Sequence, residues 1–426
     1  MKKILALALA MAMGLSLAAC GGGDKGGSPA AGPGSGSDGS SSAAPGGDGS
    51  GSDSSIKVGA IYITSQNDVA GYTYQHHNGI TTAMEALGLD PADLIVVDNV
   101  PDTDDTAVAN AIDTVVNQGA DIVFGISFGY INAMADKAED YPDVIFSHGT
   151  GYMANDTNFN NYFGRIYQAR YLAGIAAGME SKRSKNNSIG YVAAYNLDYA
   201  ETCSGINAFA LGAQSVNPDA VVYVNVINTW GNETLERQAA MALFDVYQCC
   251  VISQHCDSAQ PQQVAQEYGM KGCGYNSDMT EQAPNAHLTA AIWHWNVYYQ
   301  TAIQAAMDCN GDASKFVENM GGNAYYAGLK EGFVDTSPLN ENWDGYSDTK
   351  AIMDAVRELI VSGEWDVFSG VKLSYEITDG KVEIIKTDAP LMDDQGNEIV
   401  PAGGPSVDDS VIKGSMNYNV AGVIEG

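Results

Sequence analysis

Residues 121–151 constrain the fold of this chain more than any other stretch. Two short apolar runs with β-branched residues, 122–126 and 144–146, flank a polar stretch, 133–141, that suits a crossover helix. The pattern predicts a β-α-β unit with two parallel strands. All strands of such a sheet point the same way, so the loops that follow these two strands should emerge side by side.

Those two loops are the first candidate site. They contain Ser127-Phe128-Gly129 and Ser147-His148-Gly149. Open parallel sheets bind ligands at the carboxyl ends of their strands, so we expect a ligand site where these loops meet.

The same alternation of strands and helices occurs twice along the chain, which predicts two doubly wound α/β lobes around a cleft. The first lobe is expected at about 56–160 plus a later return segment. The second is expected at about 161–285 plus C-terminal elements. Residues 161–179, with helical apolar spacing, should cross between them. The expected strands are 56–62, 94–97, 188–194, 221–227, 251–253 and 270–275. The expected helices are 76–87, 103–118 (with Asp102 as N-cap), 201–215, 233–248 and 261–268. The chain is then expected to return through residues 287–295 and a helix at 297–309. A strand and helix at about 328–362 and an exposed hairpin at 372–388 complete the prediction.

The first 20 residues read as a bacterial lipoprotein signal peptide. Lys2 and Lys3 precede an apolar run, and Leu17-Ala18-Ala19-Cys20 matches a lipobox in which Cys20 is lipidated. Residues 21–55 are almost wholly Gly, Ser, Asp, Ala and Pro, which predicts a flexible tether. We therefore expect a protein held by lipid on the outer face of the cell membrane.

Composition excludes some partners. The 426 residues include 52 acidic and 20 basic side chains, a net charge of -32, which repels nucleic acid at long range and favours a neutral or cationic small ligand. Six cysteines remain after Cys20. Disulfides are possible in an exported protein, but without a CxxC pair we favour buried thiols over a zinc site. These six are Cys203, Cys249, Cys250, Cys256, Cys273 and Cys309.

Catalysis has one candidate. Gly125-Ile126-Ser127-Phe128-Gly129 matches the GxSxG pattern of α/β-hydrolases, with Ser127 as nucleophile. Asp257, His287 and His294 lack an obvious triad placement, so an esterase is the weaker interpretation. Metal binding through His76-His77 or His255-Cys256-Asp257 is disfavoured, because adjacent residues point in different directions.

Aromatic and amide residues dominate the expected carboxyl-end loops, a composition that suits a flat, neutral, hydrogen-bonding ligand such as a nucleobase. They are Tyr72, Tyr74, Phe128, Trp230, Tyr275, Asn276, Trp293 and Trp295.

A set of collinear segments from about residue 56 onward resembles the basic membrane protein family of ABC-transporter substrate-binding lipoproteins, which includes purine nucleoside receptors. The segments include Gly71-Tyr72-Thr73-Tyr74, Ser127-Phe128-Gly129-Tyr130, Tyr162-Phe163-Gly164-Arg165, Arg170-Tyr171-Leu172-Ala173-Gly174, Gly205-Ile206-Asn207-Ala208-Phe209 and Gly274-Tyr275-Asn276-Ser277-Asp278.

The resemblance implies a type I periplasmic-binding-protein fold that closes on a purine nucleobase or nucleoside for delivery to a membrane permease. It places Tyr72 and Phe128 in first-lobe ligand loops, His148 where nucleoside receptors have an acid, and Asp257 and Asn276 in second-lobe loops. Asn207, Trp230, Asp278 and Trp293 complete the expected ligand-binding residues, with Cys20 for lipidation. No cofactor or metal is expected, and we expect a monomer.

Two further expectations concern ligand and role. Trp293 stands where the nucleoside receptors place a Lys that contacts ribose, and Asn276 replaces an Asp, so a free base is expected to bind about tenfold tighter than its nucleoside. A ligand-sensing ectodomain with a signalling partner is the alternative to transport.

Overall fold

The structure is a computed structural model that describes residues 56–69, 71–378 and 380–426. The signal peptide, the lipobox with Cys20 and the tether expected from the sequence lie outside these residues. Within the described residues, no helix combines the length and the apolar character needed to cross a membrane.

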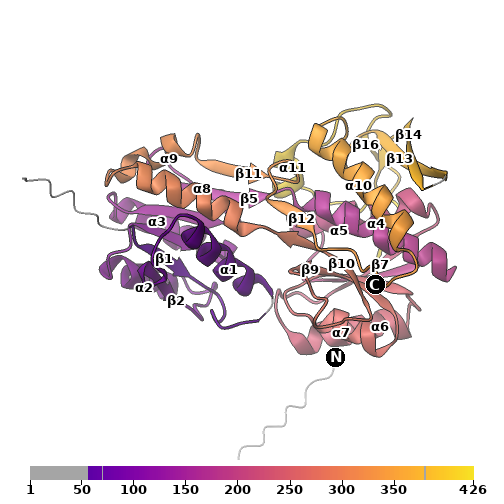
Figure 1. The fold of residues 1–426 in the computed structure, drawn as a ribbon, viewed down its shortest axis with the longest axis horizontal. Coiled ribbons are helices and arrows are strands. Elements are labelled where there is room, and N and C mark those ends of the chain that lie inside the picture. Colours follow the sequence, from indigo (N-terminus) through magenta and orange to yellow (C-terminus); the bar gives the residue numbers. More distant parts are fainter. Residues whose placement is uncertain (1–55, 70, 379) are drawn as a thin grey trace, which may run out of the picture. The chain divides into compact units, whose positions relative to one another are not determined.

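The first lobe is built on a six-stranded parallel sheet (Figure 1). In sheet order its strands are β11 (Ala324–Ala327), β5 (Phe159–Gly164), β4 (Ile145–Gly149), β3 (Ile122–Gly125), β1 (Val58–Ile61) and β2 (Leu94–Val97). Every neighbouring pair is parallel. The helices that connect or cover these strands are α1 (Gly71–Ala86), α2 (Asp105–Asn117), α3 (Ile131–Asp140), α8 (Trp295–Asp308) and α9 (Phe316–Asn319), with the short 3-10 turns η1 (Pro91–Asp93), η2 (Phe128–Tyr130) and η3 (Ala313–Lys315).

The second lobe is built on a seven-stranded sheet. In sheet order its strands are β12 (Val334–Thr336), β10 (His287–Trp293), β9 (Lys271–Asn276), β8 (Val251–His255), β6 (Ser188–Ala193), β7 (Val221–Val226) and β17 (Val423–Glu425). Only β12 runs antiparallel to its neighbour. Its helices are α4 (Ile166–Ser184), α5 (Ala200–Val216), α6 (Glu233–Asp245), α7 (Gln260–Glu267) and α10 (Tyr346–Ser362).

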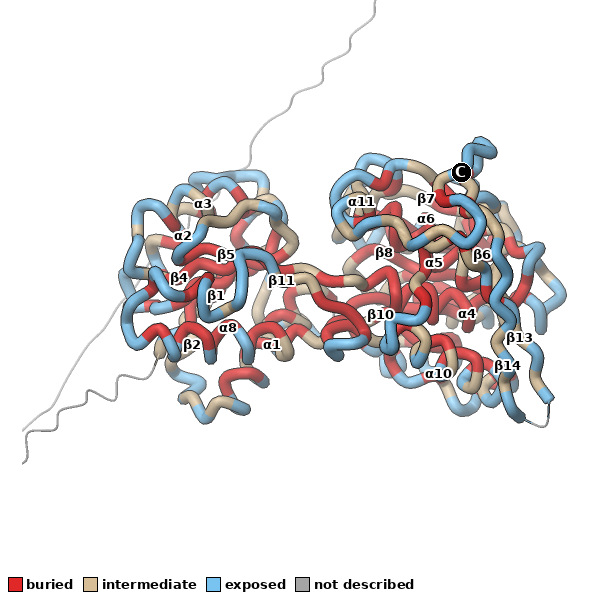
Figure 2. Tube along the Cα trace, turned by 90° about the horizontal axis from the view of Figure 1, so that it is seen from above, coloured by how far each residue is buried: buried red, intermediate tan, exposed pale blue. Residues whose placement is uncertain are grey.

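The chain passes between the two sheets three times. It leaves the first sheet after β5, returns from β10 through α8 to β11, and leaves again from β11 to β12. The central strands are buried on both faces, as covered parallel sheets require, which explains why β1 and β3 are continuous apolar runs (Figure 2). Two doubly wound α/β lobes, as predicted from the sequence, are the result.

Several element boundaries differ from the prediction. Helix α1 begins at Gly71 rather than at residue 76, and Asp104, not Asp102, caps α2 by accepting from the backbone N–H of Thr106 and Ala107. Residues 162–164, expected to be helical, form the end of β5, which pairs on both edges.

The C-terminal part folds back onto the second lobe. The expected hairpin is present as β13 (Val371–Thr378) and β14 (Lys381–Asp388), and its alternating exposure is visible in Figure 2. It is followed by the strand pair β15 (Leu391–Met392) and β16 (Glu398–Val400), the short helix α11 (Asp409–Gly414) and β17.

All six cysteines outside the signal peptide are buried free thiols. Burial raises the pKa of Cys203, Cys249 and Cys250 to about 12. In the described part of the chain, no three His, Cys, Asp or Glu side chains gather as a metal site would require. The cysteines therefore act as small apolar core residues.

Candidate functional site

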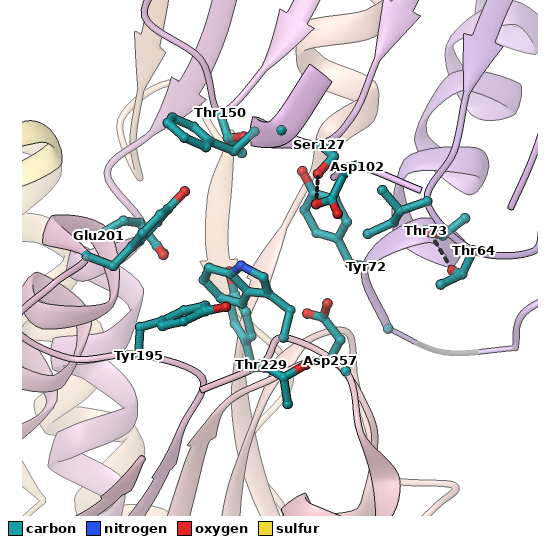
Figure 3. A pocket seen from close by; sticks show the side chains of 18 of the residues that line it. Thr64, Tyr72, Thr73, Asp102, Ser127, Thr150, Tyr195, Glu201, Thr229 and Asp257 are labelled. Atoms are coloured by element: carbon teal, nitrogen blue, oxygen red, sulfur yellow. Dashed lines mark hydrogen bonds between the residues drawn. The ribbon is translucent and has the colours of Figure 1, made fainter. Parts of the chain in front are cut away.

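A cavity of about 1660 Å³ is lined by residues from both lobes. Much of its wall is formed by the loops that follow β1, β2, β3 and β4 in the first sheet and β6, β7 and β8 in the second (Figure 3). Residues of β5, β9, β11 (Ala324–Ala327) and α11 (Asp409–Gly414) complete it. The loops after β3 and β4 meet there as expected. Ser147, His148 and Gly149 belong to β4 itself, and the residues that reach the cavity from this strand are Thr150, Gly151 and Tyr152.

Two of the rings in the first-lobe wall lie close after strands β1 and β3. Tyr72, in the first turn of α1, donates its hydroxyl hydrogen to the Ile126 carbonyl, which fixes the ring against β3. Phe128, in η2, lines the cavity with 39% of its surface exposed. An exposed Phe in a concave wall is a surface that a ligand ring can cover.

A hydrogen bond supports the loop that carries Phe128. Ser127 Oγ donates to Asp102 Oδ2 at 2.8 Å, and both residues line the cavity (Figure 3). The next position requires a glycine, because a Cβ on Gly129 would lie 2.1 Å from the Asp102 carbonyl oxygen. This close packing holds Phe128 at the cavity wall.

The second-lobe wall presents three rings in mutual contact, which are Tyr195, Tyr199 and Trp230. Their centroids lie 5.5 to 5.8 Å apart. Tyr195 and Tyr199 follow β6, and Trp230 follows β7, so strands that pair side by side bring these rings together. Together they form an aromatic surface that faces the first-lobe rings across the cavity.

A charged layer lies behind this aromatic surface. Glu201 lines the cavity and accepts a hydrogen bond from His255 Nε2 at 2.9 Å. The buried Arg170 guanidinium lies 4.0 Å from the centroid of the Tyr275 ring and donates to the Gln254 carbonyl at 2.6 Å. Burial and the Arg170 charge lower the pKa of His255 to about 4, so His255 is neutral at pH 7 and donates to Glu201.

Asp257 lies at the junction of the lobes. Its Oδ1 accepts from Asn276 Nδ2 at 3.0 Å. Burial, followed by the charge of Glu236, raises the pKa of Asp257 to about 7. Gly71, at φ +88°, packs so closely that a Cβ would lie 2.6 Å from the Asp257 carbonyl oxygen, so the start of α1 touches the opposite lobe at this point.

The cavity is strongly acidic. Six carboxylates line it, namely Asp68, Asp102, Asp198, Glu201, Glu233 and Asp257. Lys413 is the single basic residue among the described lining residues. Low-dielectric walls of one charge sign concentrate ligands of the opposite sign and repel anions. The cavity therefore suits a neutral or cationic ligand.

Four of the ten residues expected to bind ligand line this cavity: Tyr72, Phe128, Trp230 and Asp257. Asn276, whose φ is 67°, does not line the cavity itself but donates a hydrogen bond to Asp257, which does. His148 is fully buried in β4, where Nε2 bonds to the Ser127 carbonyl at 2.7 Å, so it supports the Phe128 loop from below.

The other four lie elsewhere. Trp293 was expected in the pocket, but it is 2% exposed and stacks on Trp295 with centroids 4.4 Å apart. Asn207 is buried in α5, where it binds the backbone of Tyr418 and Val420. Asp278, beside His287, and Tyr74, in α1, do not line the cavity.

The sequence reasoning missed Tyr195, Tyr199 and Glu201. All three follow β6, and the rule used for the other strands would have found them if the loop at 195–200 had been included. Tyr325 and Tyr326, at the edge strand β11, were missed because this strand returns to the first lobe late in the chain.

The geometry does not support a serine nucleophile. Ser127 Oγ donates to a carboxylate, and the nearby His148 bonds to the Ser127 backbone rather than to its hydroxyl. His287 is buried against Ser337, and His294 precedes α8 outside the cavity lining. Among the described residues, no His therefore bonds to Ser127 Oγ as the general base of a catalytic triad would.

Two sheets around a ring-lined cavity define a solute-binding protein, and comparison with known proteins agrees. Residues 56–367 match the family described as ABC transporter substrate-binding protein, PnrA-like. A purine-binding protein of Brucella abortus is 34% identical over 368 residues, covering 86% of this chain and 93% of that protein.

A protein of Haloferax volcanii that carries the name of an ABC transporter glucose-binding protein is 37% identical over 253 residues, 59% of each chain. Among solved structures, an ABC transporter solute-binding protein from Conexibacter woesei is similar with a TM-score of 0.58 and 19% identity, over 73% of this chain and 98% of that one.

The chain belongs to the PnrA-like family of ABC transporter substrate-binding proteins, which confirms the resemblance and the type I periplasmic-binding-protein fold. It is an extracytoplasmic binding protein that serves an ABC transporter, not an enzyme, and the esterase alternative is therefore rejected.

Proposed function

We propose that this protein binds a purine-type ligand, a nucleobase or nucleoside, for an ABC permease, while a lipid on Cys20 anchors it to the membrane. The ligand ring stacks on the first-lobe rings Phe128 and Tyr72, beside the second-lobe cluster of Tyr195, Tyr199 and Trp230. Free carboxylate oxygens of Glu201 and Asp257 accept hydrogen bonds from its edge.

One observation carries the proposal. Both lobes present aromatic rings to the same cavity, with carboxylates beside them. A flat ring gains stacking area on both faces only when both walls are aromatic, and its N–H edges need acceptors once water is excluded. A heterocycle with ring N–H groups meets both conditions.

The purine-binding relative supports this ligand class, since it aligns with most of this chain. The relative named for glucose makes sugars the necessary comparison. The acidic lining disfavours phosphorylated ligands, so nucleotides are expected to bind more weakly than nucleosides.

The expectation that a free base binds more tightly than its nucleoside rested on the placement of Trp293 in the pocket. Since Trp293 is absent from the cavity lining, that expectation loses its basis. The proposal therefore covers both forms of the ligand.

Calorimetry tests the proposal directly. The protein is titrated with adenine, hypoxanthine, adenosine, inosine, glucose and several amino acids. We expect binding of at least one purine at micromolar concentration. No heat from any purine, or tighter binding of glucose, would rule out the purine assignment.

Fluorescence provides an independent signal. Of the five Trp residues, only Trp230 lines the cavity. A stacked purine is expected to change the emission of the unmodified protein, and Trp230→Phe should abolish most of this change. Trp343→Phe, at a buried position outside the cavity lining whose indole N–H donates to Glu180, is the matched control.

A further inference from the structure

The six carboxylates that line the ligand cavity have no cationic partner within the protein. In the part of the chain that the structure describes, none of them forms an ion pair with a Lys or an Arg. Asp102 accepts from a hydroxyl, Asp257 from an amide and Glu201 from a neutral imidazole. These bonds leave the negative charge uncompensated, which is costly in a partly enclosed cavity.

The arrangement of these carboxylates suits a large cation better than a metal ion. Among the described residues, no three His, Cys, Asp or Glu side chains gather closely enough to hold a metal. The carboxylates are spread over both walls instead, with Asp68 and Asp102 in the first lobe and Asp198 and Glu233 in the second. A spread of negative charge matches an organic cation whose positive charge is delocalised over a ring.

Three rings of the second lobe form a corner on which such a cation can lie. The planes of Tyr195 and Tyr199 differ by 30°, and they stand at 66° and 81° to the plane of Trp230. All three rings line the cavity, and none is fully buried. The faces of aromatic rings are electron-rich and attract cations, the Trp face most strongly.

Short contacts connect this corner to the carboxylates. The Trp230 ring lies 5.9 Å, between centroids, from the ring of His255, which donates to Glu201. The Trp230 carbonyl accepts from the Asp257 N–H at 2.9 Å. Burial, followed by the charge of Glu201, raises the pKa of Tyr199 above its ordinary value. A positive charge on the corner therefore meets ring faces and carboxylates together.

Two basic groups lie near the cavity, but they do not cancel this charge. Lys413 lines the cavity, and its ammonium lies 4.7 Å from the centroid of the Tyr326 ring. The Arg170 guanidinium is buried behind the lining, 4.0 Å from the centroid of the Tyr275 ring. The lining carboxylates outnumber these two cations, so the cavity keeps a negative potential.

We propose that the site selects purines that carry a positive charge on the ring, such as purines alkylated on both imidazole nitrogens, over neutral purines. This rests on the proposed function and narrows its ligand class. Such a cation keeps the flat faces that stack on the rings. Its charge adds an attraction to those faces and to the carboxylates, which replace the water that the cation loses on binding.

Calorimetry at pH 6 on the unmodified protein compares three ligands that differ mainly in charge. 7,9-Dimethylguaninium is the cation, 9-methylguanine is its neutral parent, and 8,9-dimethylguanine is neutral and matches the cation in size. We expect the cation to bind about tenfold tighter than either neutral ligand. Added NaCl should weaken binding of the cation and leave binding of the neutral ligands nearly unchanged, because salt screens the carboxylates.

Asp198→Asn tests the role of the carboxylates without touching a buried group. Asp198 is exposed, lines the cavity and precedes Tyr199. The variant should bind the cation about threefold more weakly and 9-methylguanine with nearly unchanged affinity. Asp219→Asn, at an exposed position outside the cavity lining, is the matched control and should change neither affinity.

The outcomes separate this inference from the proposed function. If 9-methylguanine or 8,9-dimethylguanine binds as tightly as the cation, or if adenine, hypoxanthine or inosine binds and none of the three guanine derivatives does, the preference for charge is wrong and the purine assignment stands. If no purine binds, charged or neutral, both fail. An equal loss of affinity for cation and neutral ligand in Asp198→Asn would contradict the role given to the carboxylates.

Discussion

Phe128 and Tyr199 contact each other across the cavity, with ring centroids 5.8 Å apart and planes at 80°. Phe128 belongs to η2 of the first lobe, and Tyr199 precedes α5 of the second. This is a direct aromatic contact between the lobes in the cavity wall, so a ligand ring that stacks on Phe128 lies beside a ring of the other lobe as well.

Phe128→Ala should therefore weaken ligand binding with little effect on folding. Stacking of a base on an aromatic side chain is worth about 1–3 kcal/mol, so we expect a loss of roughly 5- to 150-fold in affinity. Because Phe128 is 39% exposed, the free energy of unfolding should change by less than about 1 kcal/mol.

Val361→Ala is the control for Phe128, since Val361 has a similar exposure of 37% on α10 and does not line the cavity. Calorimetry and urea denaturation are measured on both variants. Unchanged affinity in Phe128→Ala would show that the ligand ring stacks elsewhere.

Asp257 should make binding depend on pH near neutrality. With a pKa of about 7, this carboxyl gains its charge as the pH rises from 6 to 8. A ligand that donates a hydrogen bond to Asp257 should bind more tightly at pH 8 than at pH 6. Asp257→Asn should flatten this dependence, and a profile shared by both proteins would assign the titration to another group.

Asp257 should also make the stability of the fold depend on pH, but stability should fall as pH rises, whereas ligand affinity should increase. The folded-state pKa of about 7 lies above the ordinary value of 3.8, so between these values the folded protein holds a proton that the unfolded chain has lost. The contribution of Asp257 to the free energy of unfolding therefore falls as pH rises from about 4 to 7 and is constant above. Urea denaturation gives the free energy of unfolding of the unmodified protein and of Asp257→Asn at pH 4.5, 6 and 7.5. The stability of the unmodified protein relative to the variant should fall, and can reverse in favour of the variant, as the pH rises.

Tyr299→Phe should destabilise the fold. Tyr299 Oη bonds to His76 Nδ1 at 2.5 Å and to Tyr162 Oη at 2.8 Å, and all three residues are buried. Removing the hydroxyl leaves buried polar groups without a partner, which costs about 1–3 kcal/mol. Urea denaturation measures the change, and Tyr346→Phe, whose hydroxyl bonds to the exposed Glu341, should cost less than about 0.5 kcal/mol.

Cys20→Ala should release the protein from the membrane. Cys20 is the lipobox residue expected to carry the lipid, and the described residues contain no helix suited to span a membrane. Fractionation of cells should find the variant in the soluble extracytoplasmic fraction or the medium, with unchanged ligand affinity. Membrane retention of Cys20→Ala would contradict the lipobox interpretation.

Hydrophobic periodicity predicted the fold well, because buried parallel strands are short apolar runs and are easy to recognise. The expected strand at 94–97 coincides with β2, and the hairpin with β13 and β14. The end of β5 was misread because Tyr162 and Phe163 are followed directly by the apolar face of α4, and the two patterns merge.

The site was predicted only in part, for a physical reason. Strand-end loops could be placed from the sequence, and Tyr72, Phe128 and Trp230 followed from that rule, whereas Asp257 followed from the family resemblance. The side chain of a strand residue points to one face of the sheet or the other, and the sequence did not decide the face for Trp293. The face is set by tertiary packing, here by contacts of the Trp293 ring with Phe163 and Trp295, which keep it out of the cavity lining. The contribution of α11 to the cavity wall could not be seen, because its position depends on long-range contacts such as the pairing of Asp409 with Arg165.

The position of β17 has a consequence for how the chain is made. This strand forms the last edge of the second-lobe sheet, pairing Val423 with Val222, while β11 adds to the first-lobe sheet by pairing Ala324 with Asn161. Neither sheet can be completed from the N-terminal half of the chain alone. Each sheet therefore keeps an unfinished edge until these late strands have been synthesised, and contacts of such long sequence separation form slowly.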